Sequence, residues 1–184
     1  LPKDGGTRIF GVSGRVKKPG IYEFPMGTNL KDIIFESAGG MQKGEKLKAV
    51  IPGGMSAPIL KADEIDIKMD FDSLAEAKSM LGSAAVIVID EGTSIMDVLK
   101  AITKFYSHES CGQCTPCRIG NSWINKIVKR ISTGKGKKED IDTIIRLANN
   151  MMGKTLCPLG DAAAMPILSI AKKFREELES FMRN

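Results

Sequence analysis

The sequence predicts an α+β protein in which a small β-grasp domain, residues 1–91, precedes an all-α four-helix bundle, residues 92–184. Two observations support this prediction. Up to about residue 90, apolar residues alternate with polar ones between Gly- and Pro-containing turns, which is typical of strands. Beyond residue 93 they recur every three or four positions, which is typical of amphipathic helices. The 184 residues are enough for two small domains, each with its own core.

The first half is expected to open with a hairpin. Phe10, Val12 and Val16 alternate with polar or small residues, as in a half-buried strand, and residues 21–24 are expected to form the returning strand. Between them, Lys18-Pro-Gly-Ile21 fits a type II turn, because Pro fixes φ at the second position and Gly tolerates a positive φ at the third.

A helix and further strands follow the hairpin. Thr28 or Asn29 is expected to cap a short helix that ends at Gly39-Gly40. Short strands are expected at residues 47–51 and 86–89. A hairpin, a helix and further strands in this order indicate a small domain of the β-grasp kind.

The second half contains four apolar stripes with helical spacing and short connections, which together predict a four-helix bundle. Ser94 and Asp97 are expected to form a capping box at the start of the first helix. Pro166 predicts a late start or a kink in the fourth. The stripes are Ile95, Val98, Leu99, Ile102, Phe105 and Tyr106; Trp123, Ile124, Ile127, Val128 and Ile131; Ile141, Ile144, Ile145, Ala148 and Met152; and Ile167, Leu168, Ala171, Phe174, Leu178 and Phe181.

Charge and hydropathy argue against two classes of partner. The net charge is +5, but the basic residues are dispersed, and their densest group, Lys135-Gly-Lys-Lys138, lies in an expected turn with almost no aromatic residues nearby. We therefore expect no nucleic-acid partner. The longest apolar run, residues 84–89, is far shorter than a membrane span, so we expect no membrane insertion and a cytoplasmic protein, alone or peripheral to a membrane.

The four cysteines are the most informative residues. Cys111, Cys114 and Cys117 follow a two-residue spacing, and Cys157 lies 40 positions further on, before Pro158. Three thiolates from one loop, completed by a distant fourth, is the ligand pattern of an iron–sulfur cluster. The spacing alone leaves open whether the cluster is [4Fe–4S] or [2Fe–2S].

Two other uses of four cysteines fit less well. Structural zinc sites usually take their ligands as two separate C-x2-C pairs, whereas the split here is three and one. Disulfides are disfavoured because the chain shows no signal peptide and few cysteines for its length.

The predicted helices would bring these cysteines together. Cys111, Cys114 and Cys117, called the trio from here on, lie between helices one and two, and Cys157 lies between helices three and four. In an up-down bundle those two loops share one end. Thr115 is expected to cap helix two and Pro116 to be its first residue, so that Cys117 falls in the first turn. The free N–H groups and positive end of that helix would then face the anionic cluster.

Several segments resemble a known family. They are His108-Glu-Ser-Cys-Gly-Gln-Cys-Thr-Pro-Cys-Arg118 with Gly120, Thr155-Leu-Cys-Pro-Leu-Gly-Asp-Ala-Ala-Ala164, Phe10-Gly-Val-Ser-Gly14, Lys18-Pro-Gly-Ile-Tyr22, Val50-Ile-Pro-Gly-Gly54 and Ser79-Met-Leu-Gly82. Together they resemble the C-terminal part of the flavin-bearing, NADH-oxidising subunit of respiratory complex I. The same module occurs in NAD(P)-reducing hydrogenases and NAD-dependent formate dehydrogenases.

The resemblance implies a [4Fe–4S] cluster bound by Cys111, Cys114, Cys117 and Cys157, which takes electrons singly from reduced FMN and passes them to further iron–sulfur clusters. It also implies that the first half is a soluble-ligand-binding β-grasp (SLBB) domain. In that family a preceding glycine-rich domain binds FMN and NAD(P), and no such segment is present here. The first residue, Leu1, indicates a piece of a longer protein or a processed one. Because the flavin-binding domain is missing, the resemblance implies a C-terminal fragment of an oxidoreductase that is not catalytic alone, with no catalytic residue of its own. Its expected partners are the flavin domain and other iron–sulfur subunits.

Other polar residues near the cysteines have two interpretations each. His108 either lies at the surface or hydrogen-bonds near the cluster, and Glu109 and Arg118 either tune its potential or are solvated. Asp161 is expected to cap the last helix. Two alternative functions stay open at this point, a structural zinc module at a subunit interface and a ligand-binding module in the β-grasp half.

Overall fold

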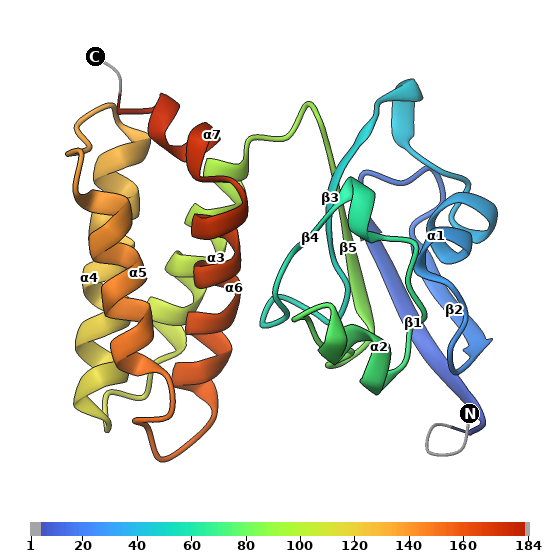
Figure 1. Cartoon of the computed structure of the whole chain (residues 1–184), viewed down its shortest axis with the longest axis horizontal. Helices are drawn as coiled ribbons and strands as arrows, with labels where there is room; N and C mark the ends of the chain where they lie inside the picture. Colours follow the sequence, from blue (N-terminus) through green and yellow to red (C-terminus); the bar gives the residue numbers. More distant parts are fainter. Residues whose placement is uncertain (1–4, 183–184) are drawn as a thin grey trace. The chain divides into compact units, whose positions relative to one another are not determined.

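The computed structural model describes residues 5–182 and confirms the α+β class. The chain forms two compact units, Leu1–Thr93 and Ser94–Asn184. The first unit is built on a sheet and the second on helices (Figure 1).

The first unit contains a five-stranded mixed sheet. Its order is β2-β1-β5-β3-β4; β1 and β5 are parallel, and the other neighbouring pairs are antiparallel. This is the predicted β-grasp arrangement, since the first and last strands lie side by side and parallel at the centre. The strands are β1 (Thr7–Gly14), β2 (Gly20–Pro25), β3 (Leu47–Ile51), β4 (Leu60–Lys61) and β5 (Ala85–Asp90).

Short helices cover one face of this sheet. Asn29 caps α1 (Leu30–Asp32) as expected, because its side chain accepts a hydrogen bond from the Lys31 N–H at 2.9 Å. The helix continues as a π-helix, Ile33–Ser37, and Gly39-Gly40, both at φ +73°, end it. The remaining short helices are Gln42–Gly44, Ala62–Glu64 and α2 (Phe71–Glu76).

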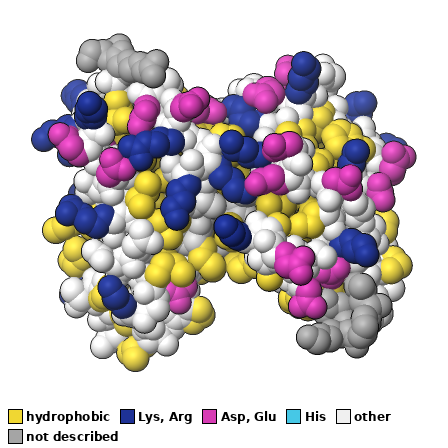
Figure 2. Space-filling view, viewed as in Figure 1, with side chains coloured by type: hydrophobic (Ala, Val, Ile, Leu, Met, Phe, Trp, Pro, Cys, Tyr) yellow, Lys and Arg dark blue, Asp and Glu magenta, His cyan; other side chains and the backbone are white. Residues whose placement is uncertain are grey.

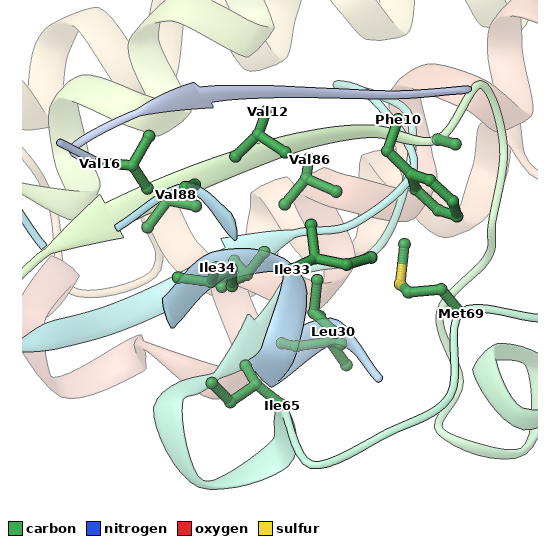
Figure 3. Close-up of a cluster of buried hydrophobic side chains, with 14 of the residues drawn as sticks. Phe10, Val12, Val16, Leu30, Ile33, Ile34, Ile65, Met69, Val86 and Val88 are labelled. Carbon is green, nitrogen blue, oxygen red and sulfur yellow. The ribbon is translucent and has the colours of Figure 1, made fainter. Parts of the chain in front are cut away.

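The core of this unit lies between the sheet and these helices (Figure 3). Phe10, Val12 and Val86 point from the strands toward Leu30 and Ile33 on the helix, and all five are buried. The alternation along β1 therefore places its apolar side chains on the buried face of the sheet, as predicted.

The expected type II turn at Lys18–Ile21 is wrong. Gly20 lacks the positive φ that the turn requires, and it begins strand β2 opposite Val12. Seven residues thus separate the paired ends, which is too many for a tight turn. The connection instead lies against the helix end, where the Lys17 and Lys18 N–H groups donate to the carbonyls of Gly40 and Ala38, both at 2.9 Å.

The second unit is a bundle of four long helices and one short one. Its helices are α3 (Ile95–Glu109), α4 (Thr115–Ser132), α5 (Asp140–Met151), α6 (Leu159–Lys173) and α7 (Arg175–Ser180). Neighbours in sequence pack together, and α6 also packs on α3, which closes the bundle. The predicted stripes form its core, except that Phe105 and Trp123 are about half exposed.

The fourth helix does not start late, which was one of the two expectations from Pro166. Helix α6 begins at Leu159, seven residues before Pro166, and continues through it with the ring buried. The bundle core therefore overrides the loss of one backbone hydrogen bond. The break comes at Phe174, after which Arg175 pairs with both carboxylate oxygens of Asp142 on α5, at 2.7 and 3.1 Å.

The expected capping box at Ser94 is also only half correct. Ser94 is the N-cap, but its hydroxyl accepts from the Met96 N–H at 3.2 Å, and the Asp97 carboxylate pairs with Lys100.

None of the helices within residues 5–182 combines the length and the hydropathy that a membrane span requires.

Candidate iron–sulfur site

Two loops meet at one end of the bundle. The loop between α3 and α4 contains Cys111 and Cys114, and the loop between α5 and α6 contains Cys157 (Figure 1). The backbone N–H of Leu156 donates to the Cys114 sulfur at 3.3 Å. The segment of the fourth cysteine is thus held directly against the trio.

The trio's loop reverses the chain within a few residues. Gly112 has φ +83°, a conformation that glycine adopts without strain, and the Arg118 guanidinium donates to its carbonyl. Along the loop, Cys111 is exposed, Cys114 is half-buried and Cys117 is buried. The three sulfurs therefore extend from the surface into the bundle.

The start of α4 lies one residue earlier than predicted. Cys114, not Thr115, is the N-cap: its backbone is extended, and its carbonyl accepts the first helical hydrogen bond, from Arg118 N–H at 2.9 Å. Thr115 and Pro116 then occupy the first two helical positions. Cys117 still lies in the first turn, close to the positive end of the helix.

Cys117 is surrounded by hydrogen-bonding groups. Its sulfur lies 3.3 Å from the Ser110 hydroxyl and 3.3 Å from the Asn121 side-chain nitrogen. Asn121 is 2% exposed, and its Oδ1 is buried without a hydrogen-bond partner.

The loop of Cys157 is braced on both sides. Asp161 accepts from the Gly153 N–H at 2.7 Å, and the Thr155 hydroxyl donates to the Cys157 carbonyl at 2.9 Å. Asp161 therefore ties down the preceding turn rather than capping α6, whose N-cap residue, Pro158, has no side-chain cap. Cys157 itself is exposed, two residues before the helix begins.

His108 lies at the surface, as the simpler interpretation predicts. Its side chain is 85% exposed, and its Nδ1 lies 3.0 Å from the Glu109 carboxylate. Both residues line an open groove of about 670 Å³ between α3 and α4, together with Lys104, Phe105 and Asn125 among others. Arg118 holds the trio's loop instead of standing free in solvent.

The donor set fits an iron–sulfur cluster. Three free thiols lie in two loops joined by a hydrogen bond and the fourth, Cys117, lies in the adjoining first turn of α4; soft thiolates are the ligands that such clusters use. Two N–H groups, from Leu156 and Asn121, point at sulfurs, and the starts of α4 and α6 lie beside the cysteines. Among residues 5–182, no group of three or more His, Cys, Asp or Glu side chains is placed to hold a single metal ion.

Three of these hydrogen-bonding residues were missed by the sequence interpretation. Ser110 and Leu156 are loop residues whose backbone direction no periodicity reveals. Asn121 did leave a signal, because it is the polar member of a buried helical face formed with Cys117, Ile124 and Val128.

Hydrophobic side chains reach the surface near this end of the bundle. Leu156 is 89% exposed, and Ile119 and Trp123 are also exposed beside a pocket of about 280 Å³ between α4 and α5. Figure 2 shows hydrophobic side chains at the surface of the lower end of the bundle, whereas Lys, Arg, Asp and Glu are intermixed toward its upper end.

Comparison with known proteins connects this geometry to a family. Residues 97–181 match the NADH-ubiquinone oxidoreductase-F iron-sulfur binding region, a 4Fe–4S region, and residues 8–88 match the SLBB domain. A NADH-quinone oxidoreductase F subunit of Rhizobium meliloti, the one numbered 2, is 48% identical over 94% of the chain. The NADH-quinone oxidoreductase F subunit of Rickettsia typhi is 45% identical over all of it. The chain spans 41% and 44% of the lengths of these relatives.

A solved structure agrees with these relatives. The crystal structure of an NAD+-reducing [NiFe]-hydrogenase in the air-oxidized state matches the whole chain with a TM-score of 0.88 and 29% identity, over 31% of that protein. The chain is thus an SLBB domain followed by a helical region that belongs to the NADH-ubiquinone oxidoreductase-F iron–sulfur binding family, and it corresponds to the C-terminal part of the F subunit of NADH-quinone oxidoreductase.

Proposed function

We propose that Cys111, Cys114, Cys117 and Cys157 bind one [4Fe–4S] cluster, and that the chain is an electron-transfer module of an NAD(P)H-linked oxidoreductase. The observation that carries the proposal is the hydrogen bond from Leu156 N–H to the Cys114 sulfur, because it brings the remote cysteine's segment to the trio. When bound, such a cluster accepts and donates one electron at a time.

Each residue of the site has a defined task in this proposal. The four thiolates hold the irons, and the loops fix the thiolates. The N–H donors from Leu156 and Asn121 and the start of α4 offset the negative charge that the cluster and its ligands bring into the protein. Cys111 and Cys157 are exposed whereas Cys117 is buried, so electrons would enter and leave on the side of the exposed pair.

The electron donor that fits this role is reduced FMN, and the acceptors are further iron–sulfur clusters. The chain spans about two fifths of the length of its relatives, so the flavin and the nicotinamide would be bound by a separate glycine-rich domain of the same polypeptide, in a complex I-type dehydrogenase or an NAD(P)-reducing hydrogenase. We further propose that residues 1–91 and 92–184 are its two domains, that the first is an SLBB domain without a ligand of its own, and that the protein works in the cytoplasm.

Anaerobic reconstitution with iron and sulfide tests the cluster. We expect about four irons and four sulfides per chain and, after reduction with dithionite, a paramagnetic signal. Cys→Ser variants at each of the four positions should lower the iron content, whereas Ser132→Ala, on the surface of α4 and far along the helix from the loops, should not. Stoichiometric zinc from an anaerobic preparation, with no cluster after reconstitution, would contradict the proposal and favour the structural zinc alternative.

A further inference from the structure

Asn121 is a costly residue for its position. It lies on the buried face of α4, among Cys117, Ile124 and Val128, and it is 2% exposed. Its Oδ1 has no hydrogen-bond partner, although a buried, unpaired amide oxygen destabilises a fold. An apolar side chain of similar size would remove that penalty, so the carboxamide requires a functional explanation.

The hydrogen bond made by the side-chain nitrogen of Asn121 supplies a functional explanation. The Asn121 Nδ2 lies 3.3 Å from the Cys117 sulfur, one helical turn away. A sulfur bound to iron has lost its proton, so it can only accept hydrogen bonds. The amide must then present Nδ2 to the sulfur, and this orientation is the one that leaves Oδ1 unpaired.

Cys117 is also the ligand at which such a bond has most effect. It is the buried cysteine, and a hydrogen bond to a charged acceptor is stronger where the surroundings exclude water. The bond favours the more negative, reduced state of a cluster, because it stabilises charge on the sulfur.

We propose that Asn121 is a positioning residue for the cluster: its buried carboxamide donates to the Cys117 sulfur, fixes the orientation of that ligand and raises the reduction potential of the cluster. This inference rests on the proposed cluster site. It adds a residue outside the four ligands that sets how readily the module accepts an electron.

The experiment compares the reduction potential of reconstituted chains. Asn121→Leu removes the donor at nearly constant volume, and Asn121→Asp replaces it with a negative charge of the same shape. Asn125→Leu is the matched control, because it makes the same change on the same helix, one turn further from the cysteines. The potential is followed by the paramagnetic signal of the reduced cluster during a dithionite titration.

We expect Asn121→Leu to shift the equilibrium toward the oxidised state roughly tenfold, which for one electron is about 59 mV. Asn121→Asp should lower the potential further, and Asn125→Leu should leave it unchanged. The melting temperature of the cluster-free Asn121→Leu chain should equal or exceed that of the wild type. An unchanged potential in Asn121→Leu, or an equal shift in Asn125→Leu, would overturn the inference.

A direct measurement on the wild-type chain tests the inference even if the variants fail to fold or to hold iron. In the wild-type chain labelled with amide-¹⁵N asparagine, pulsed electron paramagnetic resonance of the reduced cluster should show a ¹⁵N hyperfine coupling from Nδ2. Absence of this coupling in a chain that holds the cluster would overturn the inference alone. A wild-type chain that holds no cluster would instead overturn the proposed function.

Discussion

Leu156 donates its backbone N–H to the Cys114 sulfur across 42 positions of sequence. The contact joins the α3–α4 loop to the α5–α6 loop through the protein chain itself. The two cysteine segments are therefore joined by a hydrogen bond of the protein as well as by the cluster that we propose. This arrangement leads to a first prediction.

Replacing Leu156 with Pro should weaken cluster retention, because Pro has no N–H to donate. A hydrogen bond to a charged acceptor contributes roughly 1.5–3 kcal/mol. Iron should therefore be lost to a chelator about tenfold faster or more, which iron release followed by absorbance will measure. Leu156→Ala keeps the N–H and truncates a side chain that is 89% exposed, so it is the control and should behave like the wild type. Equal release rates in the two variants would show that the bond is dispensable.

Removing the cluster should loosen one end of the bundle and leave the rest folded. The cluster would link the α3–α4 and α5–α6 loops, whereas the apolar stripes bury most of the bundle's core independently of metal. Hydrogen exchange of chains with and without cluster should show lost protection confined to roughly residues 107–120 and 153–166. Global unfolding of the cluster-free chain would mean that the metal, not the core, holds this domain together.

The chain alone should neither oxidise NAD(P)H nor bind FMN tightly. The expectation follows from the sequence, which contains no glycine-rich phosphate-binding fingerprint. Flavin binding is checked by fluorescence quenching, and dehydrogenase activity with an artificial electron acceptor. Stoichiometric FMN binding by the chain would show that the flavin site lies elsewhere than we propose.

Gly120→Ala should destabilise the bundle, although the same change in an exposed helix stabilises by up to about 1 kcal/mol. A Cβ at this position would lie 2.4 Å from the Met151 sulfur and 2.7 Å from its Cγ, so the buried Met151 side chain would have to shift or α4 and α5 would have to separate. We expect a loss of roughly 1–3 kcal/mol in urea unfolding. Met151→Ala should relieve the clash, so the double variant should lose less than the sum of the single variants. Additive losses would indicate another cause.

The sequence predicts the elements better than the connections between them. Alternation along β1 and the stripes of α3 to α6 reflect burial, which dominates the energy of each element. The type II turn failed because Lys18-Pro-Gly is compatible with several loops, and the register Val12 to Gly20, a long-range property, selects among them. The late start at Pro166 failed for a similar reason, since burial in the core outweighs one missing hydrogen bond.

The same limit applies to the candidate site. Cysteine spacing and the up-down order of the helices predict which loops meet, because both are local patterns. The groups that hydrogen-bond to the sulfurs come from Ser110, Asn121 and Leu156, and only the folded backbone decides whether they point toward a cysteine. A polar residue at helical spacing from a predicted ligand, as Asn121 is from Cys117, is the one signal available in advance.

The last prediction concerns the anchor of α7. Arg175 donates hydrogen bonds to Asp142 on α5, which lowers the pKa of that carboxyl below its ordinary value of 3.8, although partial desolvation opposes the shift. The same bonds raise the pKa of Arg175, which stays protonated at every pH of interest. Because the folded state binds the Asp142 proton more weakly than the unfolded state does, the pair stabilises the fold above the unfolded pKa. That stability is lost as pH falls through the lower folded pKa.

Asp142→Asn should therefore lower the stability of the α7 segment at pH 6–7 and have a shrinking effect below about pH 4. Hydrogen exchange of residues 175–180 at pH 3 and pH 7 measures the stability of this segment in the wild type and in Asp142→Asn. Added salt should reduce the difference between the two chains at pH 7, because the Arg175–Asp142 pair is exposed. Glu109→Gln is the control, since it removes a carboxylate that contacts His108 at the last residue of α3, at the opposite end of that helix from α7, and should leave these amides unchanged. A difference between wild type and Asp142→Asn that is as large at pH 3 as at pH 7 would mean that the side chain acts by packing rather than by charge.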